Sequence, residues 1–212
     1  MLYKLYQQHI FPHVLNQVMQ TPSLMDLRRE LLLAVSGDVL EIGFGTGLNL
    51  AFYQNVNSVY ALEPHSSVFA LASERVQHAP FYVEHVAASA ESIPFEDGYF
   101  SSVVSTWTLC SVSDLSACLH EIYRVLAPNG TFHLIEHVLH RQNLNIQRLQ
   151  HLLTPIQKRV ADGCHLNRDI EVALLEAGFD IEFIQYSDAA GLPKIGQHML
   201  MARVRKPQSS VF

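Results

Sequence analysis

Three glycines alternate with larger residues in the stretch LEIGFGTGL at positions 40–48, which follows a short apolar run. Gly43, Gly45 and Gly47 have the spacing G-x-G-x-G, and Glu41 stands two residues before the first of them. Because glycine has no Cβ, such a turn lets the backbone approach a ligand closely. A dinucleotide site requires G-x-G-x-x-G and a Walker loop requires a nearby lysine, so this stretch disfavours phosphate ligands.

Two acidic residues stand at the ends of consecutive apolar runs. Glu41 closes the first run, and Glu63 closes the second. In nucleotide-binding folds, an acid at the end of the second strand accepts hydrogen bonds from the ribose hydroxyls. A carboxylate at position 41 is unfavourable beside a pyrophosphate and favourable beside a cation. S-adenosylmethionine, a cationic nucleoside without phosphate, fits both acids. The alternative is that the glycines only form a tight turn and that Glu63 is a solvated residue at the end of a strand.

The elements that must position these residues alternate between strands and helices. The pattern predicts strands at 38–43, 58–64, 81–89, 97–107 and 131–138, with helices at 47–55, 66–77 and 113–130 between them. This alternation indicates a parallel sheet with helices on both faces. The segment at about 140–166 has its own helical periodicity, and we interpret it as an insertion on the substrate side. A helix at 169–179 and an antiparallel pair of strands at 179–187 and 197–205 follow.

The composition restricts the class of protein. The chain has 212 residues, of which 49% are hydrophobic, and a formal net charge of -6. Such a charge argues against binding to nucleic acid through phosphate contacts. The three cysteines form no C-x-x-C pair, which favours reduced thiols in the cytoplasm. No apolar run reaches the ~20 residues of a membrane span, so we expect no transmembrane segment.

The ordered motifs resemble those of class I S-adenosylmethionine-dependent methyltransferases, and in particular the type-11 methyltransferase domain. The resemblance spans about residues 38–140 and rests on VLEIGFGTG, the acid in LEP, SAESIPFEDGYFSSVV and EIYRVLAPNGTFHLIEHV. It implies an α/β, Rossmann-like sheet of seven mostly parallel strands in the order 3-2-1-4-5-7-6, with the last strand antiparallel. The segments TLCSV, IEHV and DGCHL further resemble alkyl-thiol methyltransferase-like proteins and bacterial relatives labelled phospholipid N-methyltransferases.

The resemblance assigns cofactor roles to individual residues. The methionine end would be held by Glu41, Gly43, Gly45 and Gly47, and Phe44 between them would also contact the cofactor. Glu63 would bind the ribose, Pro64, Ala90 and Glu91 would surround the adenine, and Thr106 would lie beneath the sulfonium. Many relatives have an aspartate where Ser89 stands. Here Ser89 or the backbone of Ala90 must therefore take the adenine amino group.

Methyl transfer from a sulfonium is an in-line displacement, so the protein mainly positions the acceptor and excludes water. A general base is needed only if the acceptor arrives protonated. His137, after the fifth predicted strand, is the candidate base; the alternative is a surface histidine. We expect no metal site, because nothing near His133, His137 and His140 supplies a carboxylate or thiolate. Cys164 is interpreted as a small buried apolar residue.

Four further residues are candidates for the substrate site, namely Tyr6, His9, Trp107 and His165. The predicted organisation is an N-terminal helical lid at 1–36, a methyltransferase domain at 37–206 and a tail at 207–212. For the first segment, a helix that only covers the sheet edge is an equal alternative to a lid. Trp107 could equally form a wall of the substrate site or belong to the core.

The sequence therefore predicts a cytoplasmic methyltransferase that uses S-adenosylmethionine and acts on a small apolar thiol or amine. The alternatives are a phosphatidylethanolamine N-methyltransferase and a catalytically silent protein that only binds S-adenosylmethionine. The expected partner is a small-molecule or lipid acceptor and not a nucleic acid. Transient membrane contact stays open, although the N-terminal stretch has only Lys4 as a basic residue.

Overall fold

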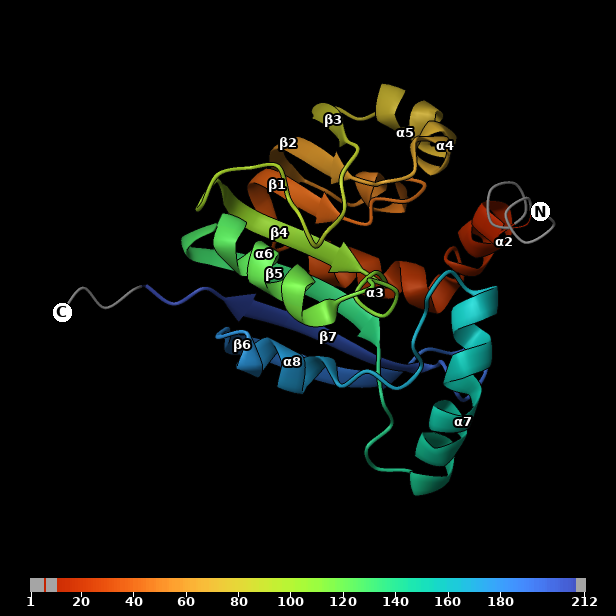
Figure 1. The fold of residues 1–212 in the computed structure, drawn as a ribbon. Coiled ribbons are helices and arrows are strands. Elements are labelled where there is room, and N and C mark those ends of the chain that lie inside the picture. The colour runs from red at the N-terminus through yellow and green to blue at the C-terminus, as the bar shows by residue number, and fades with distance from the viewer. Residues whose placement is uncertain (1–5, 7–10, 209–212) are drawn as a thin grey trace.

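The computed structural model describes residue 6 and residues 11–208 of the chain (Figure 1). Its centre is a sheet of seven strands in the order β3-β2-β1-β4-β5-β7-β6. The strands are β1 (Ser36–Ile42), β2 (Asn55–Leu62), β3 (Tyr82–Val86), β4 (Phe100–Thr106), β5 (Leu126–His137), β6 (Asp180–Asp188) and β7 (His198–Arg205). β7 runs antiparallel to both of its neighbours, and the other pairs are parallel. The predicted strand order and the antiparallel last strand are confirmed.

Helices cover both faces of the sheet, as Figure 1 shows for α3 (Pro22–Leu32) on one face and α6 (Leu115–Val125) and α8 (Ile170–Glu176) on the other. Side chains alternate along a strand, so successive residues of β1 enter different cores. Val39 packs in the core formed with α3, whereas Leu40 packs in the core formed with α6 and α8. By the same alternation, Glu41 points to the face that α3 covers.

Two helices lie beyond the carboxyl ends of the parallel strands, namely α2 (Phe11–Val18) and α7 (Leu144–Val160) (Figure 1). The predicted insertion supplies α7, whose first turn is capped by the Asn143 side chain through the backbone N–H groups of Asn145 and Ile146. Open α/β sheets bind ligands at this edge. Within the described residues, no helix is long and apolar enough to cross a membrane.

The helix predicted at 47–55 is wrong. Only the short 3₁₀ helix η2 (Leu48–Ala51) forms there, because β2 already begins at Asn55 to pair with Ser36 of β1. The helix predicted at 66–77 is present but divided into α4 (Ser66–Phe69), η3 (Ala70–Ala72) and α5 (Ser73–Gln77).

The helix predicted at 113–130 ends early, at Val125. The residues from Leu126 onward join β5 instead. Pro128 explains this difference, because proline disfavours helical geometry in the residue before it and cannot donate a backbone hydrogen bond inside a helix.

Candidate active site

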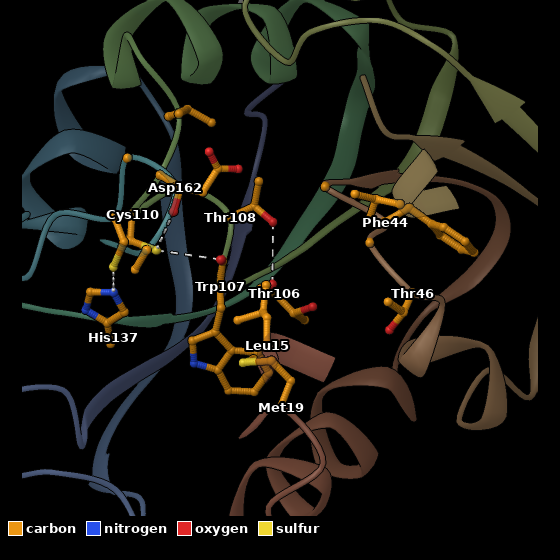
Figure 2. A pocket seen from close by; sticks show the side chains of 18 of the residues that line it. Leu15, Met19, Phe44, Thr46, Thr106, Trp107, Thr108, Cys110, His137 and Asp162 are labelled. Atoms are coloured by element: carbon orange, nitrogen blue, oxygen red, sulfur yellow. Dashed lines mark hydrogen bonds between the residues drawn. The ribbon is translucent and has the colours of Figure 1, made fainter. Parts of the chain in front are cut away.

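A cavity of about 920 Å³ lies at the carboxyl edge of the sheet. Figure 2 shows Phe44 and Thr46 of the glycine turn on one side of it, Cys110 and His137 on the other, and Trp107 between them. The N-terminal helix α2 and the residue after it contribute to the lining with Pro12, Leu15, Asn16, Val18 and Met19. The hydroxyl of Thr46 donates a hydrogen bond of 2.6 Å to the Asn16 side chain, which ties the helix to the glycine turn.

The glycine turn has a left-handed backbone at all three glycines, with φ values of 64°, 59° and 75° at Gly43, Gly45 and Gly47. A Cβ on Gly43 would lie 2.2 Å from Oγ1 of Thr108, so no side chain fits there. Gly43 and Gly45 line the cavity as predicted. Gly47 is not among the described lining residues, and its Cβ position lies 3.1 Å from Phe44 and from Ala72. Gly47 thus packs behind the turn, and its contact with the cofactor stays a prediction.

Glu41 is buried beneath this turn, with 2% of its surface exposed. One carboxylate oxygen accepts a hydrogen bond of 2.7 Å from the Tyr53 hydroxyl, and the other accepts one of 2.9 Å from the Asn49 amide. Burial raises the pKa of Glu41 to about 7, although the hydrogen bond from Tyr53 and the nearby Arg28 charge act in the opposite direction. Glu41 lines the cavity, and direct contact with the cofactor stays a prediction.

Arg28 of α3 is a buried cation at the same place, and no motif in the sequence singles it out. Its Nη1 donates to Oδ1 of Asn49 at 2.6 Å and to the Thr106 hydroxyl at 3.0 Å. Its guanidinium lies 4.6 Å from the ring centre of Trp107. Burial lowers the pKa of Arg28 to about 10, against the opposing effect of the Glu41 charge. Arg28 and Asn49 thus connect α3, η2 and the end of β4.

Glu63 lies where the sequence predicts the ribose-binding acid, at the end of β2 and on the cavity wall. Its two carboxylate oxygens accept hydrogen bonds from the backbone N–H groups of Gly45 at 3.1 Å and His65 at 3.0 Å. Burial raises the pKa of Glu63, while these two hydrogen bonds lower it. Pro64 also lines the cavity beside it.

The residues predicted to surround the adenine line the cavity after β3. The Ser89 hydroxyl donates to the Glu91 carboxylate, which also accepts hydrogen bonds from the backbone N–H groups of Ser113 and Asp114. Ala90 is buried between Ser89 and Glu91. Glu91 therefore joins the loop after β3 to the loop before α6, and the adenine contacts of these residues stay predictions.

The loop after β4 has an unusual backbone. Trp107 has φ 56°, which is strained for a bulky residue. The carboxylate of Glu136 accepts hydrogen bonds from the backbone N–H groups of Thr108 and Leu109, each at 2.8 Å, and from Cys110 at 3.3 Å. This carboxylate fixes the loop. Trp107 packs against the core and also lines the cavity, and its role as a wall of the substrate site stays a prediction.

His137, the candidate base, lies at the end of β5 and lines the cavity. Its Nε2 is 3.0 Å from Sγ of Cys164, and Cys110 lies on the same wall. The hydrogen bond from Cys164 and the neighbouring His137 lower the pKa of the Cys110 thiol, despite its burial. All three residues are more than nine-tenths buried, so His137 is not a surface histidine.

The remaining substrate candidates lie less close to the cavity. His165 is not among its described lining residues; its Nδ1 lies 3.2 Å from the backbone carbonyl of Cys110. Tyr6 donates from its hydroxyl to the Val160 carbonyl at the end of α7, at 3.1 Å, and does not line the described cavity. His9 lies outside the described residues.

Comparisons with known proteins agree with this geometry. Residues 40–134 match the sequence family described as methyltransferase domain. The human thiol S-methyltransferase TMT1A is 33% identical over 156 residues, which cover 71% of this chain and 63% of that protein. Residues 40–134 of this chain are thus identified as a methyltransferase domain.

Solved structures of methyltransferases share the fold. A putative methyltransferase from Bacillus halodurans has a TM-score of 0.68 at 17% identity, and the match covers 87% of this chain and 99% of that one. An S-adenosylmethionine-dependent methyltransferase from Methanosarcina mazei has a TM-score of 0.64 at 21% identity, over 84% of this chain and 96% of that one. These structures confirm the predicted fold, and the match of residues 40–134 confirms the predicted resemblance to the methyltransferase domain.

The methyltransferase relatives are longer than this chain. The chain spans 60 to 64% of the length of the thiol S-methyltransferases that it matches. This chain and these relatives thus share the methyltransferase domain, and the names of the relatives do not give the acceptor of this chain.

Proposed function

We propose that this methyltransferase binds S-adenosylmethionine in the cavity and transfers its methyl group to the sulfur of a small apolar thiol. One observation carries the proposal: two chemically different groups of residues line the two ends of a single cavity. The glycine turn and Glu63 line one end, Cys110 and His137 line the other, and Thr106 lies between them. The relatives described as thiol S-methyltransferases support the acceptor class.

The residues at the first end suit the cofactor. Each carboxylate oxygen of Glu63 accepts one backbone hydrogen bond, and a carboxylate oxygen has a second lone pair. Those free lone pairs match the two hydroxyls of a ribose. Gly43 and Gly45 leave room for a ligand against the backbone, and the Arg28 cation suits the methionine carboxylate. Bound S-adenosylmethionine would supply the activated methyl group.

The second end suits a small apolar acceptor. Outside the glycine turn, the cavity lining includes the apolar side chains Leu15, Met19, Leu166, Leu192 and Met199. A thiol has a pKa near 8.5, so it needs modest help to ionise, whereas an amine must lose a proton from a strongly basic group. His137 is our candidate for the group that promotes this ionisation. Its Nε2 lies 3.0 Å from Sγ of Cys164, at the same end of the cavity.

The test is an acceptor comparison with methyl-labelled S-adenosylmethionine. Short alkyl thiols, matched primary amines and phosphatidylethanolamine vesicles are incubated with the enzyme, and products are measured by mass spectrometry. We expect a labelled methyl thioether from the thiols. Glu63→Gln should weaken S-adenosylhomocysteine binding by about 10- to 100-fold, because hydrogen bonds to charged groups contribute about 1.5–3 kcal/mol. The exposed Glu84→Gln on β3 serves as its control.

Each other result has a definite meaning. Methylation of the amines or of phosphatidylethanolamine without thiol methylation would overturn the proposed acceptor. Tight binding of S-adenosylhomocysteine without turnover of any acceptor would favour the silent binding protein. The comparisons give no support to these two alternatives.

A further inference from the structure

Three side chains that can bind a metal meet on one wall of the cavity. Cys110 follows β4, His137 ends β5, and Cys164 follows α7. Their two Sγ atoms and an imidazole nitrogen all lie within 4.8 Å of one another. Two thiolates and one imidazole are a ligand set of catalytic zinc sites, in which the fourth position is left open to water or substrate.

We propose that Cys110, His137 and Cys164 bind one Zn²⁺ ion and that the acceptor thiol is its fourth ligand. The metal site stands on the geometry of the three side chains. Only the identity of the fourth ligand rests on the proposed function. The site replaces our expectation of no metal, which considered only histidines close in the sequence.

Backbone contacts hold the two cysteine loops in place before any ion binds. Glu136 accepts the backbone N–H of Cys110, and the backbone N–H of His165 donates to the Cys110 carbonyl at 2.8 Å. A Cβ on Gly163 would lie 2.8 Å from the Ser111 carbonyl oxygen, so this turn needs glycine to lie against the other loop. A metal site needs such fixed ligands, because ordering them at binding would cost affinity.

Neighbouring groups complete the cluster. The guanidinium of Arg168 donates to the backbone carbonyls of Leu109 and Val112 and so clamps the Cys110 loop. The Gln157 amide lies 3.8 Å from Sγ of Cys164, as a donor to a metal-bound thiolate would. Hydrogen bonds of this kind around the ligands tune a metal site.

The surroundings distinguish this cluster from an ordinary buried thiol pair. The exposed fractions of Cys110, His137 and Cys164 are 3%, 8% and 8%, yet all three line the cavity. Nδ1 of His137 is buried and has no hydrogen-bond partner among the described residues. The nitrogen that faces the thiols is Nε2, at 3.0 Å from Sγ of Cys164, and this atom would be the ligand. The second group with suitable geometry, formed by His140, Asp188 and His198, is absent from the cavity lining.

The ion would change the chemistry of the acceptor. A thiol that coordinates Zn²⁺ releases its proton to solvent and binds as a thiolate. Its sulfur then forms a bond to the methyl carbon, while the bond from that carbon to the sulfonium sulfur breaks. The electron pair of the broken bond stays on the sulfur of S-adenosylhomocysteine. The product is a neutral thioether, a weaker zinc ligand that can leave.

The first experiment measures metal content. The full chain is purified reduced and without chelator, and zinc per chain is determined by plasma mass spectrometry. We expect one equivalent in the native protein and in Cys118→Ser, whose thiol is buried in α6 and is not part of the cluster. Cys110→Ser and Cys164→Ser should each lose at least tenfold in zinc affinity. Folding of each variant is checked by circular dichroism and by binding of S-adenosylhomocysteine.

The second experiment replaces zinc by Co²⁺ in the native protein. The cobalt form should show a thiolate charge-transfer band and tetrahedral d–d bands, and ethanethiol should shift the d–d bands whereas ethylamine should not. The metal site is overturned if the native protein takes up no zinc. It is also overturned if Cys110 and Cys164 form a disulfide and the protein takes up no zinc after this disulfide is reduced. Thiol methylation at full rate by zinc-free protein would overturn the acceptor thiol as the fourth ligand. Zinc binding without thiol methylation would leave the site standing and refute the proposed function instead.

Discussion

Glu41 illustrates how the environment of one residue sets its chemistry. It stands on the sheet face that α3 covers, and its partners are the Tyr53 hydroxyl, the Asn49 amide and the Arg28 charge. The sequence placed the carboxylate at the turn correctly. Its partners could not be predicted, because Arg28 lies on another helix and nothing in its spacing points to Glu41.

The raised pKa of Glu41 gives a prediction for stability. Its pKa of about 7 in the folded protein lies above the ordinary value of 4.5, so the folded state holds the proton more tightly. Its contribution to stability is therefore fully present below pH 4.5 and is lost as the pH rises through 7. In Glu41→Gln, this dependence should disappear. The free energy of unfolding of the native protein, relative to the variant, should fall by at most about 3 kcal/mol between pH 5 and pH 8.

Denaturant unfolding at pH 5, 6, 7 and 8 measures this difference. Glu84→Gln changes an exposed carboxylate on the edge strand β3 and is the matched control. A difference between native protein and Glu41→Gln that stays constant across this range would contradict the prediction. A difference that grows with pH would mean that Glu41 is ionised and stabilised by Arg28.

At the scale of the element, the turn after β1 is held by its glycines. Gly43→Ala would place a methyl group 2.2 Å from the Thr108 hydroxyl at a φ of 64°. Overpacking typically costs about 1–3 kcal/mol, and a left-handed backbone adds roughly 1 kcal/mol for a residue with a Cβ. We expect Gly43→Ala to destabilise the protein by about 2–4 kcal/mol and to weaken S-adenosylhomocysteine binding. Denaturant unfolding and calorimetry measure the two effects.

Gly196→Ala is the matched control, because a Cβ there has no atom within 4 Å. It should change the stability by less than about 1 kcal/mol, since a glycine-to-alanine change without strain is mildly favourable. Equal stability of the Gly43 and Gly196 variants would show that the loop after β4 moves away readily. That result would contradict the role of Glu136 in fixing this loop.

The elements themselves were predictable to different degrees. The strands were predicted well, because buried parallel strands are short apolar runs with clear boundaries. The helix at 47–55 failed, because its apolar residues fit a helix locally while strand pairing from Asn55 shortens it. Pro128 marked the end of α6 only approximately, since the helix already stops at Val125.

At the scale of the molecule, the cavity depends on segments that are remote in the sequence. The glycine turn was predictable because its signal is contiguous. The grouping of Cys110, His137 and Cys164 was not, because each lies in a different segment and only the fold brings them together. The covering of the cavity by α2 was an open alternative in the sequence, and Leu15, Asn16 and Met19 now line it.

This architecture predicts how ligand binding spreads through the protein. Saturating S-adenosylhomocysteine at 100 times its Kd stabilises the bound state by about 2.7 kcal/mol. Opening motions that break the site should therefore slow by up to about 100-fold. If α2 is a lid, amide hydrogen exchange should slow in Leu15–Met19 as well as in the glycine turn. Exchange in α8, which does not line the described cavity, should change little.

Hydrogen exchange with mass spectrometry, with and without the ligand, separates the two interpretations of the N-terminal segment. The Thr46–Asn16 hydrogen bond is the contact through which the turn would transmit binding to α2. Asn16→Ala should remove most of the extra protection of α2 and leave that of the turn intact, because the turn keeps its own contacts with Glu63. Slower exchange in the turn with no change in α2 of the native protein would make the helix a static cover of the sheet edge and exclude the lid.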